Sequence, residues 1–229
     1  MSQIINYGSC CIDHVFQTPH FVRAGETLSS TGYAIFPGGK GLNQSIAVAE
    51  AGCAVTHVGA VGEDGRWLAE LMTARGVDIT HLSILDTPTG QAILQIDPRG
   101  ENAIIILGGA NLTPHDHLID AALADARGDE ILLIQNETSG NDAAIRRAKA
   151  KGLQVAFNMA PMNASAQALP LALIDYFIIN ETEGEALTGK SNPHEICVAV
   201  LEQYPNSAVV LTLGQAGVQF RSAELNLSQ

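Results

Sequence analysis

A glycine-rich turn is the part of this chain best suited to chemistry. Residues Gly38 to Asn43 (GGKGLN) place a lysine and an amide among three glycines, directly before a helical run that closes at Gly52. Glycine lets the backbone turn tightly and approach a ligand closely, and the start of a helix presents unpaired N–H groups. The turn therefore predicts a site for a small polar molecule, although a Gly-Gly-x-Gly sequence before a helix is often only a tight loop.

Two carboxylates follow expected strands. Asp13 comes after the first strand, and Glu137 follows the strand Ile131–Gln135 on its carboxyl side, the usual ligand edge of an open parallel sheet. A carboxylate at such a place can accept strong, charge-assisted hydrogen bonds from a polar ligand, although Asp13 alone could be a solvated turn residue. Asn43 offers both donor and acceptor atoms to neighbouring hydroxyls, and Lys40 offers up to three donors.

A second polar group follows the later strands. Asn180 and Glu183 form an N-x-x-E pair at the start of a helix, where a carboxylate is also an ordinary capping feature. The loop after the last strand adds three candidates: Thr212, Gly214 and Gly217. His115 and His117 have no third ligand nearby, so we assign them no metal site.

Composition limits the class of protein. The 229 residues are 46% hydrophobic and 16% charged, which is typical of a globular chain. The net charge of −12 disfavours nucleic acid and anionic membranes as partners, but it does not disfavour a nucleotide. No secretion signal and no apolar run of about 18 residues is present. Four cysteines without a C-x-x-C pair favour a reducing cytoplasm.

The order of apolar runs predicts an α/β fold with a mainly parallel sheet, because strand-like and amphipathic runs alternate. The expected strands are Ile4–Gly8, Ala54–Val61, Ile131–Gln135, Val155–Asn158, Tyr176–Asn180 and Ala208–Leu213. The expected helices are Leu42–Ala51, Arg66–Arg75, Pro114–Ala126, Asn141–Lys151, Glu181–Leu187 and Pro193–Gln203. Four glycines follow such helices, where a left-handed residue is common: Gly52, Gly76, Gly152 and Gly189.

Two regions interrupt this alternation and predict a small β-sheet beside the main body. Cys11–Phe36 is a long extended stretch, and three short runs look like antiparallel strands joined by turns: Leu82–Leu85, Gln91–Asp97 and Ala103–Leu107. We expect lid strands within about 11–36 and 82–107, with a ligand in the cleft between the lid and the main body.

The spacing of Gly39, Asn43, Ser45, Gly52 and Gly62 follows the first signature of the PfkB family of carbohydrate kinases, and the chain resembles the ribokinase-like members. Other resembling segments follow in the family's order over essentially the whole chain: Gly8-Ser9 with Asp13, Pro37–Asn43, Val61–Asp64, Gly109–Asn111, Glu137, Asn158 with Pro161, Asn180–Glu183, Leu187–Gly189, Leu211–Gly214 and Gly217-Val218.

The resemblance implies a ribokinase-like fold over residues 1–229, with a central sheet flanked by helices and a β-lid. It implies transfer of the γ-phosphate of ATP to a hydroxymethyl group of a sugar, with ribose-like sugars favoured, and a homodimer through the lid. The implied sugar contacts are Cys11, Asp13, Gly39, Lys40, Gly41, Asn43 and Glu137. The implied nucleotide contacts are Asn180, Thr212, Gly214 and Gly217, with Glu183 reaching Mg²⁺ through water.

The chain departs from the family pattern in two places. Cys11 stands where ribokinase-like sequences usually carry an asparagine that touches the sugar, so fructose-like, deoxyribose-like and nucleoside substrates stay open. The family's second signature, a G-A-G-D helix start with the general-base aspartate, does not occur in these residues. We therefore expect the catalytic aspartate, the anion hole and any K⁺ loop to lie beyond Gln229, so that the domain is incomplete and inactive as a kinase.

Two other functions compete with this prediction. A non-catalytic sugar-binding or regulatory module would use the same glycine turn and Asp13 without moving a phosphate. A dinucleotide-binding enzyme would need its G-x-G-x-x-G directly after the first strand. Gly8 is instead followed by Ser9 and Cys10, which disfavours that enzyme class.

Overall fold

The computed structural model describes residues 3–113, 115–124 and 126–229. A nine-stranded sheet forms the body, in the order β13-β12-β11-β10-β9-β8-β1-β4-β5. Its strands are β1 (Ile4–Tyr7), β4 (Val55–Gly62), β5 (Asp78–Leu85), β8 (Ile131–Gln135), β9 (Gln154–Asn158), β10 (Tyr176–Asn180), β11 (Ala208–Thr212), β12 (Val218–Arg221) and β13 (Asn226–Ser228). The strands from β11 to β5 run parallel, and β12 and β13 are antiparallel additions. This agrees with the expected mainly parallel α/β sheet.

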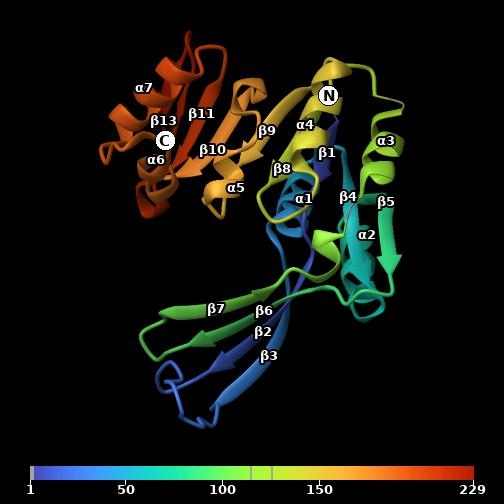
Figure 1. The fold of residues 1–229 in the computed structure, drawn as a ribbon, viewed down its shortest axis with the longest axis vertical. Coiled ribbons are helices and arrows are strands. Elements are labelled where there is room, and N and C mark those ends of the chain that lie inside the picture. The colour runs from blue at the N-terminus through green and yellow to red at the C-terminus, as the bar shows by residue number, and fades with distance from the viewer. Residues whose placement is uncertain (1–2, 114, 125) are drawn as a thin grey trace.

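Helices cover both faces of this sheet (Figure 1). They are α1 (Lys40–Glu50), α2 (Arg66–Ala74), α3 (Asp116–Ala124), α4 (Asn141–Ala150), α5 (Ala164–Gln167), α6 (Glu181–Thr188) and α7 (Pro193–Gln203). Successive residues of a strand point to opposite faces. Ile5 belongs to the apolar cluster that includes residues of α3, α4 and α7, whereas its neighbour Ile4 packs against the cluster that includes residues of α1 and α2. All eight residues of β4 are buried, as expected for a parallel strand covered on both sides.

The glycines expected to end helices do so. Gly52, Gly76, Gly152 and Gly189 have φ angles of 81°, 82°, 84° and 70°, in the left-handed region that favours glycine. The expected helix Pro114–Ala126 falls partly outside the described residues, and α3 begins at Asp116. Among the described residues, no helix is long and apolar enough to cross a membrane.

The second sheet is the lid, which we define as β2 (Cys11–Gln17), β3 (Gly32–Gly38), β6 (Gly90–Ile96) and β7 (Asn102–Leu107), in the order β3-β2-β6-β7. It projects from one end of the body (Figure 1). Strand β2 pairs antiparallel with β3 and parallel with β6. The expected extended stretch Cys11–Phe36 is therefore two strands joined by residues 18–31, and the second strand continues to Gly38.

One predicted lid strand is wrong. Leu82–Leu85 belongs to β5, which pairs parallel with β4 at the edge of the main sheet. The run follows α2 and completes a β-α-β unit, and Leu82 packs on the cluster that α1 and α2 cover. Its half-buried position at a sheet edge makes its sequence look like an exposed antiparallel strand.

Candidate functional site

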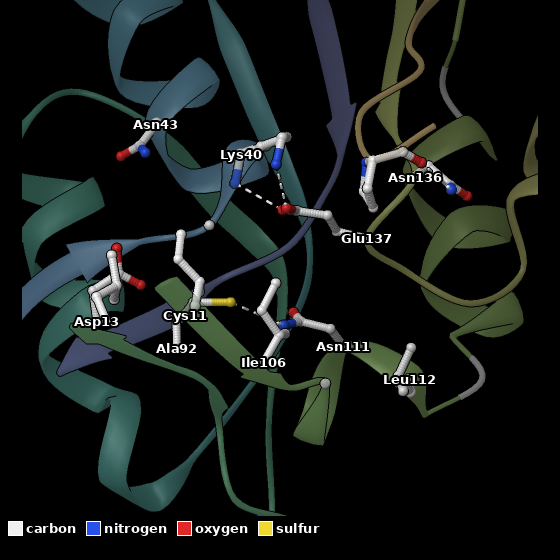
Figure 2. A pocket seen from close by; sticks show the side chains of 15 residues that line it. Cys11, Asp13, Lys40, Asn43, Ala92, Ile106, Asn111, Leu112, Asn136 and Glu137 are labelled. Carbon is white, nitrogen blue, oxygen red and sulfur yellow. Dashed lines mark hydrogen bonds and ion pairs between the residues drawn. The ribbon is translucent and has the colours of Figure 1, made fainter. Parts of the chain in front are cut away.

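A cavity of about 430 Å³ lies between the lid and the carboxyl edge of the main sheet (Figure 2). Its volume falls in the range of small-molecule sites. Strands β2, β6 and β7 contribute residues from the lid, and α1 and the loop after β8 contribute residues from the body. The lining is Cys11, Asp13, Gly39, Lys40, Asn43, Ala92, Leu94, Ile104, Ile106, Gly108, Asn111, Leu112, Asn136, Glu137 and Pro161.

The glycine turn lets α1 begin at this cavity. Gly39 has a φ of 93°, which side chains rarely adopt. A Cβ on Gly38 would overlap the Asp13 carboxylate, and a Cβ on Gly41 would lie 2.5 Å from the Gly8 Cα. The three glycines thus bring the helix start against the end of β1 while leaving room for the carboxylate.

A buried network of polar side chains holds the first turn of α1 in place. Asn6 Nδ2 donates to Gly41 O and to Ser45 Oγ, each at 2.8 Å, and Asn6 Oδ1 accepts from Gln135 Nε2 at 2.9 Å. Ser45 Oγ lies 2.8 Å from Nδ1 of His57, which is fully buried. Burial lowers the pKa of His57 to about 4, so the ring is neutral near pH 7.

Lys40 and Glu137 join the helix start to the end of β8. Lys40 Nζ donates to Glu137 Oε1 at 2.7 Å, and Lys40 N donates to Oε2 at 2.9 Å. Ser9 Oγ donates to the same Oε2 at 2.5 Å. The Glu137 side chain is 16% exposed and Lys40 39%, so the pair is only partly screened by solvent. Three chain segments therefore meet at one carboxylate.

Asp13 and Asn43 present polar atoms to the cavity (Figure 2). Among the described residues, no hydrogen bond to the Asp13 carboxylate or the Asn43 amide occurs. Burial and the nearby Glu137 raise the pKa of Asp13 above its ordinary value. A half-buried carboxylate of this kind gains most from hydroxyl donors, because they replace the water it has lost.

Cys11 lies deeper in the cavity and is 8% exposed. Asn111 Nδ2 donates to Cys10 O at 2.9 Å and approaches Cys11 Sγ at 3.6 Å. Burial, followed by the charges of Glu137 and Asp13, raises the pKa of Cys11 to about 12. The thiol is therefore neutral near pH 7.

The second expected group lies at the same sheet edge, two strands from β8. Asn180 and Thr212 are register partners at the carboxyl ends of β10 and β11. Glu183 N donates to Asn180 Oδ1 at 2.8 Å, and Asn180 N donates to Glu183 Oε2 at 3.0 Å, which is a complete capping box on α6. Gly214 begins a 3₁₀ turn between β11 and β12, Gly217 follows that turn, and both have positive φ.

The structure brings most expected sugar contacts together and separates them from the expected nucleotide contacts. Six of the seven expected sugar contacts line the cavity, and Gly41 supports it from the first turn of α1. None of Asn180, Glu183, Thr212, Gly214 and Gly217 lines it. Spacing of about 4.8 Å between strands puts the ends of β8 and β10 roughly 10 Å apart.

Sequence reasoning missed several residues of this site. Ser9 holds Glu137, and Ile104 and Ile106 form the lid wall of the cavity. Alternation in the run NAIIIL would have placed Ile104 and Ile106 on one face, although not which face. The described residues contain no group of three His, Cys, Asp or Glu side chains arranged to hold a metal ion.

Comparisons with known proteins agree with this geometry. Residues 1–227 match the model of the pfkB family carbohydrate kinases. Ribokinase of Haemophilus influenzae is 35% identical over 220 residues, which cover 92% of this chain and 72% of that protein.

Solved structures give the same result. Ribokinase from Cryptococcus neoformans in complex with ADP is 34% identical with a TM-score of 0.83, and the match covers all of this chain and 78% of that one. Ribokinase of Arabidopsis thaliana complexed with ribose and ATP is 27% identical with a TM-score of 0.82, and the match covers the same shares. The chain therefore belongs to the PfkB family of carbohydrate kinases and has a ribokinase-like sequence and fold.

Proposed function

We propose that these residues carry the sugar site and part of the nucleotide site of an ATP-dependent kinase that phosphorylates a hydroxymethyl group of a ribose-like sugar. The observation that carries this proposal is the lining of one cavity by Asp13, Lys40, Asn43 and Glu137 in a chain of the PfkB family. A pocket with few, convergent polar groups suits a small polyol better than a large apolar ligand.

Each polar residue has a separate task in this proposal. Asp13 accepts hydrogen bonds from two sugar hydroxyls, and Asn43 donates to one hydroxyl and accepts from another. Lys40 has two further N–H donors beyond the one it gives to Glu137. Glu137 fixes the position of the ammonium group, and the backbone of Gly39 allows the sugar to approach closely.

The nucleotide lies along β10 and β11 in this proposal. Asn180, Thr212, Gly214 and Gly217 would hold the phosphates, and Glu183 would reach Mg²⁺ through water. Only one oxygen of Glu183 is used by the capping box, which leaves the other for a hydrated ion. MgATP supplies the phosphoryl group and neutralises its charge.

A polypeptide limited to these 229 residues should bind sugar without phosphorylating it at a useful rate. The sequence contains no G-A-G-D segment, and loss of a general base typically slows a reaction by about 10²–10⁴-fold. A second candidate that would use the same cavity is a sugar-binding or regulatory module that never transfers phosphate.

Binding measurements separate these candidates. A panel of sugars and MgATP should each raise the melting temperature of the polypeptide if it carries both halves of a kinase site. Sugar binding with no MgATP binding would favour the module. The absence of stabilisation by any sugar or nucleoside would overturn the sugar site itself.

We also propose a homodimer through the lid, in the cytoplasm. Both edge strands of the lid, β3 and β7, expose large apolar side chains, including Ile35 at 50% and Ile105 at 66% on the face opposite the cavity. Such a patch is typical of an interface. Light scattering should give a dimer, and Ile105→Lys should give a monomer. Leu225→Lys, at a site 53% exposed between β12 and β13, is the control, and a monomeric wild type would contradict the proposal.

A further inference from the structure

The segment Val61–Asp64 follows the family pattern, yet none of its residues is among the described residues that line the cavity. It ends β4 and begins the 3₁₀ turn Glu63–Gly65, and it contacts Thr89, the residue directly before β6. Strand β4 belongs to the body and β6 to the lid (Figure 1). This contact therefore joins the lid to the body.

Thr89 is fully buried in a socket that we define as Gly62, Asp64 and Gly65. The Thr89 hydroxyl donates to Asp64 Oδ1 at 2.7 Å and accepts from Gly62 N at 2.8 Å. Thr89 N donates to the same Oδ1 at 3.0 Å. A Cβ on Gly65 would overlap the Thr89 hydroxyl, so only glycine leaves room there. The socket therefore holds Thr89 by both its backbone and its side chain.

The Asp64 carboxylate strengthens this contact. Burial alone would raise the pKa of Asp64, but the hydrogen bonds from Thr89 outweigh burial and hold the pKa below its ordinary value. Asp64 is therefore ionised near pH 7, and hydrogen bonds to an ionised acceptor are roughly twice as strong as neutral ones. Loss of the Thr89 hydroxyl would also leave the buried Gly62 N without its partner.

The chain segment that leaves the lid packs against the same point. Ala110 N, in the 3₁₀ turn after β7, donates to Pro88 O at 2.8 Å. A Cβ on Gly109 would overlap Pro88 O, which shows how closely the two backbones approach. The entry to β6 and the exit from β7 are therefore joined to each other and, through Thr89, to the body.

The proposed sugar site spans the junction that Thr89 supports. Asp13 lies on β2 of the lid, whereas Lys40 and Asn43 lie on α1 of the body. Ala92, the register partner of Asp13, is three residues from Thr89, which is about 10 Å along β6. A rotation of about 6° at Thr89 would move Ala92 by roughly 1 Å. A shift of this size breaks hydrogen bonds, so sugar binding depends on the angle of the lid.

We propose that Thr89 is a positioning residue, whose contacts with the socket hold the lid at the angle that sugar binding requires. This inference rests on the proposed sugar site and deepens it by naming a residue outside the cavity on which sugar affinity depends. Asp64 acts through Thr89 in the same way, because it accepts both hydrogen bonds that Thr89 donates.

Calorimetric titration of D-ribose, 2-deoxy-D-ribose and D-fructose into wild type and Thr89→Val tests this inference. Valine keeps the shape of threonine and removes the hydroxyl. The affinity of every sugar that binds wild type should fall by about 3- to 30-fold in Thr89→Val, the usual coupling through residues that touch no ligand. Thr89→Ser, which keeps the hydroxyl, should retain most of the wild-type affinity.

Thr56→Val is the matched control. Thr56 is a buried threonine at the amino end of β4, and its hydroxyl also donates to a carboxylate, Asp78 Oδ2, at 3.1 Å. This variant loses the same kind of hydrogen bond away from the lid, so it should keep the wild-type sugar affinity. Amide hydrogen exchange of the free protein should become faster in the lid strands of Thr89→Val and stay unchanged there in Thr56→Val.

Equal sugar affinity in wild type and Thr89→Val, or an equal loss in Thr56→Val, would overturn the inference and leave the proposed function intact. Absence of binding by all three sugars to wild type would overturn both. If Thr89→Val does not fold, Asp64→Ala gives the same test at an exposed side chain, with the exposed Asp78→Ala as its control.

Discussion

The two ends of the sheet's carboxyl edge are built in opposite ways. At the sugar end, Ser9 and Lys40 reach Glu137 across 128 and 97 residues of sequence, and Gln135 reaches Asn6 across 129. At the nucleotide end, the main polar contact is a capping box whose partners are three residues apart.

This difference indicates how substitutions at each end should affect stability and ligand binding. The sugar end exists only when several distant segments have folded together, so it depends on burial and close packing. The nucleotide end is formed by the start of one helix, α6, whose capping hydrogen bonds join residues only three positions apart. Substitutions at the sugar end should therefore affect both stability and sugar binding. Substitutions at the nucleotide end should affect stability without affecting sugar binding.

Acidification should have the largest effect on the free energy of unfolding, and this effect should arise at the sugar end, where His57 is buried. The folded pKa of His57 is about 4, below the ordinary 6.5, because the ring is buried. Between pH 6.5 and 4 the unfolded chain takes up a proton that the folded chain does not, so the free energy of unfolding falls as pH falls. The 2.5-unit gap corresponds to about 3 kcal/mol. Urea unfolding of wild type and His57→Gln at pH 7 and pH 4 measures this loss.

The variant should remove that pH-dependent loss, since glutamine does not titrate. His57→Gln will be less stable at pH 7, but its disadvantage should shrink by about 3 kcal/mol at pH 4. His117→Gln, on the exposed face of α3, is the control and should follow wild type. A constant difference between wild type and His57→Gln across this range would contradict the role of the buried ring.

A glycine pair makes the next comparison. Gly41→Ala should destabilise the protein by about 1–3 kcal/mol, because its Cβ would press on the backbone of Gly8 and Ser9. It should also weaken sugar binding, since the start of α1 must shift. Gly214→Ala at the nucleotide end meets no atom within 4 Å and carries only the strain of its positive φ. Denaturant unfolding and sugar titration of both variants test this comparison. Loss of sugar binding in Gly214→Ala but not in Gly41→Ala would contradict the account.

Removal of a helix N-cap, at the start of α6 or of α7, should have the smallest effect. Asn180→Ala removes the cap of α6 and Asn192→Ala removes the cap of α7, each at a cost of about 1 kcal/mol in stability. Only Asn180→Ala should weaken MgATP binding, because only α6 begins at the proposed phosphate end. Equal MgATP affinity in the two variants, measured by calorimetry, would show that Asn180 is only a helix cap.

Much of the fold followed from local pattern. The strands at β8 and β10 matched their apolar runs to the residue, and the glycines after four helices fell where left-handed caps occur. Leu82–Leu85 was misassigned because its half-buried residues at the sheet edge resemble those of an exposed antiparallel strand, although the run pairs parallel with β4. Nothing within that run shows whether it pairs with β4 or with a lid strand.

The candidate site was predictable in its members but not in their partners. Asp13 and Glu137 stand out because carboxylates follow strands, and Lys40 and Asn43 because they sit in the glycine turn. The ion pair between Lys40 and Glu137 and the buried position of His57 depend on long-range folding, so no local signal carried them. Their roles in sugar binding stay predictions.

Calorimetric titration of sugars into wild type, Asp13→Asn and Asn180→Ala tests the central claim most directly. The account predicts that at least one pentose binds wild type, that Asp13→Asn weakens it at least about tenfold through the lost charge, and that Asn180→Ala leaves it unchanged. Equal sugar affinity in wild type and Asp13→Asn, or sugar affinity lost in Asn180→Ala, would contradict a sugar site built between the lid and α1.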